Sequence, residues 1–271
     1  MTSRPGSEGF VSRHRFVFLF GVLVAFYVLT PLVDQLRGGL DTAVLPLVEG
    51  LLFVALLFAT VVSVSKGRAW TLFALLLAFP AAVLRFVAIV VASGGVDISH
   101  YLLLIAFLGY VIWVLLRAIF DSRQVTFNTV CASLCIYLLL GLLWALAYSL
   151  DDVLDPAAFT CTVAADKFAP VLRARRGDTT VLYFSFATLT TLGYGDIVPT
   201  SPISRMLASI EAITGQLYLA VLVARLVGMH IVYSRGQEQP RDGEPAEEER
   251  TQGLARREPA TNSATRTPPR C

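Results

Sequence analysis

The sequence predicts an all-α membrane protein, with six transmembrane helices and one shorter helix that enters the membrane without crossing it. Hydrophobic residues make up 55% of the 271 residues, and charged residues only 15%. The charged residues gather near the two ends of the chain and in short breaks between apolar runs. A bilayer core roughly 30 Å thick takes about 20 helical residues to cross, and apolar runs of about that length recur along the chain.

Six apolar runs are long enough to cross a membrane. They cover residues 15–33, 43–64, 69–92, 101–120, 130–150 and 203–233. The first has the basic start of a signal peptide, but no small-residue cleavage site follows before Pro31, so we expect it to remain as a helix. Residues 179–190 are apolar but cover only about half a membrane as a helix, which predicts a re-entrant helix, with Asp178 placed to cap it.

Lys and Arg residues in the short loops predict the orientation of the chain. They cluster on one side of the predicted membrane, at Arg4, Arg13, Arg15, Lys66, Arg68, Arg117 and Arg123. This side is expected to be cytoplasmic, because cytoplasmic loops carry an excess of Lys and Arg. An even number of crossings then predicts a multi-pass protein of the cell membrane with both termini in the cytoplasm.

A glycine-containing motif follows the predicted re-entrant helix: residues 191–196 read Thr-Leu-Gly-Tyr-Gly-Asp. A cation that crosses an apolar slab must exchange its water shell for protein oxygens, which backbone carbonyls can supply if they all point inward. Ordinary L-residues resist the required dihedral angles and glycine tolerates them, so Gly193 and Gly195 suit this conformation. Non-helical backbone at membrane depth is tolerated where it lines a water-filled cavity. The motif therefore predicts an ion path.

Residues 188–196, Thr-Leu-Thr-Thr-Leu-Gly-Tyr-Gly-Asp, resemble the pore signature of potassium channels. The mechanism that follows is that of the family, whose filter replaces the water shell of K⁺ with backbone carbonyls. The resemblance implies K⁺ sites at Thr191, Leu192, Gly193 and Tyr194, with the Thr191 hydroxyl closing the innermost site and Gly195 completing the filter. Leu192 stands where the family commonly has Val.

The resemblance also implies residues that support the filter. Tyr183 and Phe184 occupy the aromatic cuff of the family's pore helix, and Thr190 and Asp196 flank the filter. We expect the Tyr183 hydroxyl to donate a hydrogen bond to Asp196. Ala187 stands where some family members place a carboxylate, so no second carboxylate is expected to share that role.

One chain supplies one filter strand, since no second Gly-Tyr-Gly occurs in the sequence. Encircling an ion therefore predicts a homotetramer of fourfold symmetry, embedded in membrane lipids. The predicted parts are a cytoplasmic N-terminus (1–14), a four-helix transmembrane domain (15–124), a pore domain (125–235) and a disordered cytoplasmic tail (236–271). The pore domain comprises an outer helix, a turret, the pore helix, the filter and an inner helix.

Three ionisable residues within predicted spans are informative, because charge inside a membrane is costly. Glu49 and Arg85 lie at matching depths, which predicts an intramembrane ion pair or, alternatively, a sensor of ligand or voltage. Glu211 lies near filter level in the last span and is expected to brace the pore helix. In the same span, the offset of Gly215 from Tyr194 matches the family's gating hinge, although close packing of a small residue explains it equally well.

The predicted function is passive, selective K⁺ conduction without catalysis or an organic cofactor. The span 101–120 carries Arg117 alone, whereas voltage sensing needs several arginines along one helix, so weak voltage dependence is expected. A transporter subunit and a non-conducting sensor protein are the rival readings. A net charge of +2 gives no basis for nucleic-acid binding, and the four cysteines lack metal-ligand spacing.

Overall fold

The computed structural model describes residues 8–35, 44–64, 68–90, 94–121, 126–161 and 179–238, which are mostly helical. The elements are α1 (Glu8–Gln35), α2 (Val44–Val64), α3 (Arg68–Val90), α4 (Gly94–Phe120), α5 (Phe127–Leu154), β1 (Phe159–Cys161), α7 (Thr179–Leu189), β2 (Ile197–Pro199) and α8 (Pro202–Glu238). The chain divides into two units, Met1–Leu226 and Val227–Cys271. The functional elements described below belong to the first unit.

Five helices are long and apolar enough to cross a membrane among the described residues. Their apolar parts are Arg15–Val33, Ala69–Ala88, Gly94–Phe120, Phe127–Leu154 and Pro202–Arg225. The remaining expected span corresponds to α2, whose stretch Val48–Ser63 is apolar but shorter than the others, so a sixth crossing stays a prediction. The short helix α7 covers nearly the same residues as the predicted re-entrant helix.

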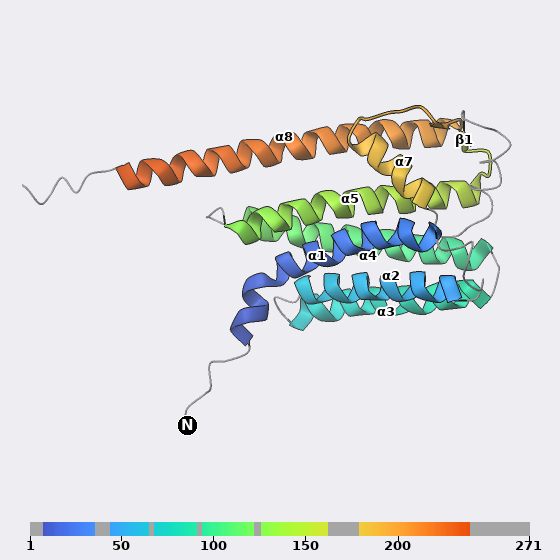
Figure 1. Cartoon of the computed structure of the whole chain (residues 1–271), viewed down its shortest axis with the longest axis horizontal. Coiled ribbons are helices and arrows are strands. Elements are labelled where there is room, and N and C mark those ends of the chain that lie inside the picture. The colour runs from blue at the N-terminus through green and yellow to red at the C-terminus, as the bar shows by residue number, and fades with distance from the viewer. Residues whose placement is uncertain are drawn as a thin grey trace, which may run out of the picture. The chain divides into compact units, whose positions relative to one another are not determined.

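Helices α1 to α5 lie side by side within the first unit (Figure 1). The helix α1 packs against α2 and α5, while α4 packs against α3 and α5. Their shared core is apolar and includes the fully buried Leu19, Leu56, Phe107 and Leu139. Cys131 and Cys135 lie in this core as buried free thiols, as expected for small apolar residues.

The helices extend beyond the predicted apolar runs. For example, α4 begins at Gly94, and α5 begins after its N-cap Thr126, whose hydroxyl accepts a hydrogen bond from the Thr129 amide. Helical hydrogen bonding continues through polar residues at membrane boundaries, which hydropathy alone does not register. The same applies at α1, which begins within the predicted N-terminal segment, and at α8, which ends three residues into the predicted tail.

Several predictions from the sequence lie outside the described residues. They concern the helix cap Asp178, the loop residues Arg4, Lys66 and Arg123, and the tail from residue 239 onward. The two strands were not predicted from the sequence. They form an antiparallel pair in which Phe159 lies opposite Pro199 and Cys161 opposite Ile197. This pair joins the segment after α5 to the segment that precedes α8.

Candidate functional site

The short helix α7 stands between α5 and the first unit's part of α8 (Figure 1). Its buried Phe184 ring packs edge-on against Tyr148 of α5, with ring centroids 5.0 Å apart, and against Phe159 of β1 at 5.4 Å. Edge-to-face packing of this kind fixes the relative orientation of aromatic rings. Phe184 therefore anchors α7 to the C-terminal part of α5.

The C-terminal end of α7 holds the start of the segment 191–196, which we call the filter segment. The amide of Thr191 donates to the carbonyl of Thr188 at 2.9 Å. The amides of Leu192 and Gly193 both donate to the carbonyl of Ala187, at 2.8 and 3.1 Å. These bonds turn the chain sharply out of the helix and direct its amides back toward α7, which leaves the filter carbonyls free of these contacts.

Backbone dihedral angles alternate in sign along the filter segment. Thr191, Gly193 and Gly195 have positive φ angles of 57°, 56° and 75°, whereas Leu192 and Tyr194 between them do not. In an ordinary strand successive carbonyls alternate between two sides. A change in the sign of φ at every second residue turns successive carbonyls toward one side. This alternation is compatible with a row of main-chain oxygens on one side of the segment, which is a suitable ligand set for a desolvated cation.

Asp196 ties the end of the filter segment to α7. The Tyr183 hydroxyl donates to Asp196 Oδ2 at 2.8 Å, so the hydrogen bond expected from the sequence is present. The other carboxylate oxygen accepts from the Ile197 amide at 3.0 Å, at the start of β2. Thr190, by contrast, bonds locally, because its hydroxyl donates to the carbonyl of Phe186 within the same chain at 2.6 Å.

Glu211 is fully buried and connects three helices. Its Oε1 lies 2.6 Å from the hydroxyl of Ser185 on α7, and its Oε2 accepts a hydrogen bond from Tyr148 of α5. The Ser185 hydroxyl also lies 2.7 Å from the carbonyl of Gly141 on α5. Glu211 therefore contacts α7, the helix that it was expected to brace, and it contacts α5 as well.

Gly215 lies where α8 passes the end of α7. A Cβ atom at this position would overlap the carbonyl oxygen of Leu189 and contact its side chain at 3.0 Å. The absence of a side chain is therefore required for the close approach of the two helices, which is the packing alternative considered above. The neighbouring Gln216 reaches the filter segment, with its Nε2 3.4 Å from Thr191 Oγ1.

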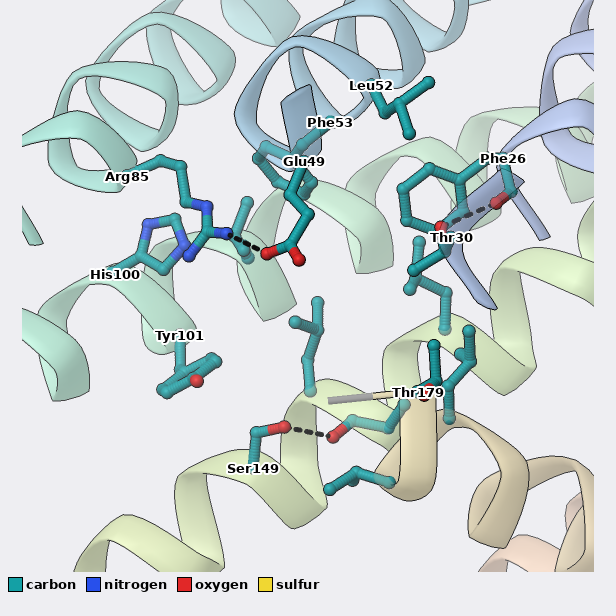
Figure 2. A pocket seen from close by; sticks show the side chains of 16 residues that line it. Phe26, Thr30, Glu49, Leu52, Phe53, Arg85, His100, Tyr101, Ser149 and Thr179 are labelled. Atoms are coloured by element: carbon teal, nitrogen blue, oxygen red, sulfur yellow. Dashed lines mark hydrogen bonds and ion pairs between the residues drawn. The ribbon is translucent and has the colours of Figure 1, made fainter. Parts of the chain in front are cut away.

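Glu49 and Arg85 form an ion pair in the lining of a cavity of about 120 Å³ (Figure 2). Arg85 Nη2 lies 3.6 Å from Glu49 Oε2, and the side chains are only 12% and 11% exposed. Apolar side chains, among them Leu182 of α7, and the buried His100 line the rest of the cavity, together with the polar residues Thr30, Tyr101, Ser149 and Thr179. The two side chains that were expected to pair do form an ion pair, beside a cavity that Leu182 of α7 also lines.

Sequence reasoning missed several residues at this site. The positive φ of Thr191 was not foreseen, because β-branched residues rarely adopt it. Ser185, Tyr148 and Gly141, which surround Glu211, were also missed, since a hydroxyl or glycine within an apolar run carries no periodic signal. Pairing of the strands β1 and β2 could not be foreseen either, because three-residue strands show no usable alternation.

Comparisons with known proteins match the region that contains α7 and the filter segment. Residues 168–230 match a family described as ion channel. The chain is also 32% identical over 104 residues to an inward rectifier potassium channel, Kirbac3.1, from Paramagnetospirillum magnetotacticum. That similarity covers 37% of this chain and 27% of the relative, so it spans about a quarter of the relative's length.

Proposed function

Because residues 168–230 match the ion channel family and the chain is similar to a potassium channel over 104 residues, we propose that it is one subunit of a potassium-selective channel. K⁺ is the transported ion and passes down its electrochemical gradient. The carbonyls of Thr191, Leu192, Gly193 and Tyr194 coordinate it, and Gly195 completes the filter. The protein performs no covalent chemistry in this reading.

The alternation of φ along the filter segment is the observation that carries this proposal. Coordination by a row of carbonyls on one side of the strand compensates K⁺ for the hydration free energy that it loses. No charged side chain is needed for this compensation. The C-terminal end of α7 lies next to this row, and the partial negative charge of a helix C-terminus favours a cation there. Tyr183, Phe184 and Asp196 support the strand from behind.

Four copies of the chain surround the ion path in this proposal. Leu192 and Tyr194 are 55% and 69% exposed in a single chain. A hollow of about 800 Å³, lined by Tyr27, Tyr183 and Tyr194 among others, lies behind the filter segment. Exposed apolar surface of this kind is typical of an interface with another copy. A cyclic homotetramer covers these groups.

The remaining assignments follow from the same proposal. The six helices cross the cell membrane with both termini in the cytoplasm, as the distribution of Lys and Arg predicts. The pore domain begins after α4, and the four helices before it form a transmembrane domain whose core continues into α5. Gly215 serves close packing and, in addition, is the proposed bending point of α8. The Glu49 and Arg85 pair stabilises the four-helix domain.

Ion flux into liposomes tests the proposal. We expect purified protein to give K⁺ flux that exceeds Na⁺ flux, follows the gradient and is blocked by Ba²⁺. Gly193→Ala should abolish this selectivity, because a side chain at positive φ costs about 1–2 kcal/mol and distorts the strand. Gly109→Ala is the matched control, since a Cβ there meets no atom within 4 Å and α4 tolerates Ala.

The rival readings predict different results in this assay. Uphill or coupled flux would identify a transporter subunit, and the absence of flux from correctly assembled protein would identify a non-conducting membrane protein. If Gly193→Ala gave the same K⁺-selective flux as wild type, the filter segment would not be the part of the chain that determines selectivity.

A further inference from the structure

The hydrogen bonds around Glu211 require one more hydrogen than an ionised carboxylate leaves available. The Ser185 hydroxyl carries a single hydrogen. Its oxygen nevertheless lies 2.7 Å from the Gly141 carbonyl and 2.6 Å from Glu211 Oε1, and both of these are acceptors if Glu211 is ionised. Both distances are typical of a full O–H···O hydrogen bond. One hydrogen cannot fill two such contacts.

A proton on Glu211 resolves this count. The carboxylic acid then donates from Oε1 to the Ser185 oxygen, and Ser185 donates its own hydrogen to the Gly141 carbonyl. The Tyr148 hydroxyl donates to Oε2, as it does in either case. Each of the three short oxygen–oxygen contacts then contains one hydrogen. In the ionised form, one pair of oxygens at 2.6 or 2.7 Å would face each other without a hydrogen between them.

The surroundings of Glu211 offer no counter-charge for an ionised carboxylate. The side chain is fully buried, and within the described part of the chain it forms hydrogen bonds with the hydroxyls of Ser185 and Tyr148. In the described part of the chain, no Lys, Arg or His forms an ion pair with it. The other titratable groups on this side belong to α5, namely Tyr137 and, one turn beyond Tyr148, Asp151. None of these groups supplies positive charge, and a buried charge without a partner is strongly disfavoured.

We propose that Glu211 is a neutral carboxylic acid whose proton completes a hydrogen-bonded chain from α8 through Ser185 of α7 to the Gly141 carbonyl of α5. Glu211, Ser185 and Tyr148 are thereby positioning residues for the pore helix. The filter segment hangs from the C-terminal end of that helix, so the chain sets the place of the filter relative to α5 and α8. This part of the inference rests on the proposed channel function, whereas the protonation state does not.

Infrared difference spectroscopy of the full-length protein in lipid at neutral pH tests the protonation state. The C=O stretch of a carboxylic acid is well separated from the bands of a carboxylate. We expect wild type to show an acid band that Glu211→Gln lacks. If the difference spectrum shows the loss of carboxylate bands instead, the proposal is wrong, whether or not the protein conducts ions.

Ser185→Ala gives a second, independent reading of the same chain. The acid proton loses its acceptor in this variant, so we expect the acid band to persist but to shift to higher frequency. Ser149→Ala is the matched control, because the Ser149 hydroxyl on α5 donates only to the Ala145 carbonyl at 2.9 Å. An unshifted band in Ser185→Ala, or an equal shift in Ser149→Ala, would contradict the proposed chain.

The positioning role is tested by flux in the same variants. Glu211→Gln should conserve K⁺ flux to within about tenfold, because its amide group donates to Ser185 and its oxygen accepts from Tyr148. Glu211→Leu, which fills the space without hydrogen bonds, should lower selectivity and flux well below Glu211→Gln. Equal behaviour of the Gln and Leu variants would refute the positioning role. Wild-type protein that shows the acid band but no flux would refute the channel proposal alone.

Discussion

Thr191 is the only non-glycine residue with a positive φ angle among those that the structure describes. For a β-branched residue this conformation is a genuine outlier, and it costs about 1–2 kcal/mol. Three hydrogen bonds restrain it: the Thr191 amide donates to the Thr188 carbonyl, the Thr191 hydroxyl donates to the Thr190 carbonyl, and Gln216 Nε2 lies 3.4 Å from that hydroxyl. Strain of this kind persists only where the surrounding structure imposes it, and it gathers at functional sites. The positive φ angle of Thr191 is therefore attributed to its position as the first residue of the filter segment.

Tyr183→Phe should speed the loss of current during sustained opening. The substitution removes only the hydrogen bond to Asp196, which restrains the outer end of the filter segment. We expect the decay rate to rise about two- to tenfold, the range that corresponds to a hydrogen bond of about 0.5–1.5 kcal/mol. Macroscopic currents from reconstituted protein measure the rate. Tyr137→Phe is the control, because the Tyr137 hydroxyl has no hydrogen-bond partner within the described residues, and equal rates in both variants would refute the restraint.

Individual functional residues could be predicted from the sequence in two cases: where a charge inside the membrane is energetically costly, and where a residue belongs to a recognisable motif. Charge inside a membrane is expensive, so Glu49, Arg85 and Glu211 attracted attention, and depth along each helix was enough to pair the first two. The motif placed Tyr183 opposite Asp196. Ser185 gave no such signal, because a serine in an apolar helix is most often bonded within its own turn. Its bridging role appears only when α5, α7 and α8 are brought together.

The contact between α7 and α8 depends on a missing side chain. Gly215→Ala should displace the two helices, because the new Cβ would overlap the Leu189 carbonyl at the end of α7. Overpacking of this kind costs about 1–3 kcal/mol, so we expect a lower melting temperature and reduced K⁺ flux. The measurement is thermal unfolding in detergent together with liposome flux.

Gly228→Ala is the control on the same helix, since a Cβ at Gly228 meets no atom within 4 Å. Stability of Gly215→Ala equal to that of Gly228→Ala would contradict the packing role. Because packing alone accounts for a loss of flux in Gly215→Ala, that variant does not by itself establish bending at Gly215.

At the scale of elements, hydropathy located the helices and missed their ends. Apolar runs identify membrane helices because every backbone group inside the bilayer must be bonded within its own segment. Polar residues such as Asp97 in the first turn of α4 and Thr126 at the N-cap of α5 lie beyond those runs and still belong to the helices or their caps. The strands β1 and β2 were missed because their pairing joins segments far apart in the sequence, Phe159–Cys161 and Ile197–Pro199.

Response to membrane voltage is a property of the whole molecule, and it depends on charged residues within the membrane helices. The helix α4 carries one arginine, Arg117, and not the regularly spaced series that a voltage sensor requires. The Arg117 guanidinium lies 5.7 Å from the ring of Trp70 and 5.9 Å from that of Trp113, which holds it at the end of the helix. Voltage sensors move several charges across the field in each subunit, each worth about 2.3 kcal/mol per 100 mV.

We therefore expect the open probability of the purified protein to change little between −100 and +100 mV, with less than about one gating charge per subunit. Planar bilayer recording measures this directly. Arg117→Gln should leave the weak dependence unaltered. Steep activation by depolarisation in wild type would show that charge outside α4 moves in the field.

Only residues 121–126 separate α4 from α5, and the two helices pack side by side. A connection this short lets consecutive helices fold back on each other and does not let the second cross to a distant neighbour. In the proposed tetramer, the helices α1 to α4 of each subunit would therefore pack against the pore domain of the same subunit. In a tetramer that mixes wild-type and variant subunits, a substitution in α1 to α4 would then directly affect the pore domain of its own subunit. It would reach the other subunits only through the interfaces between them.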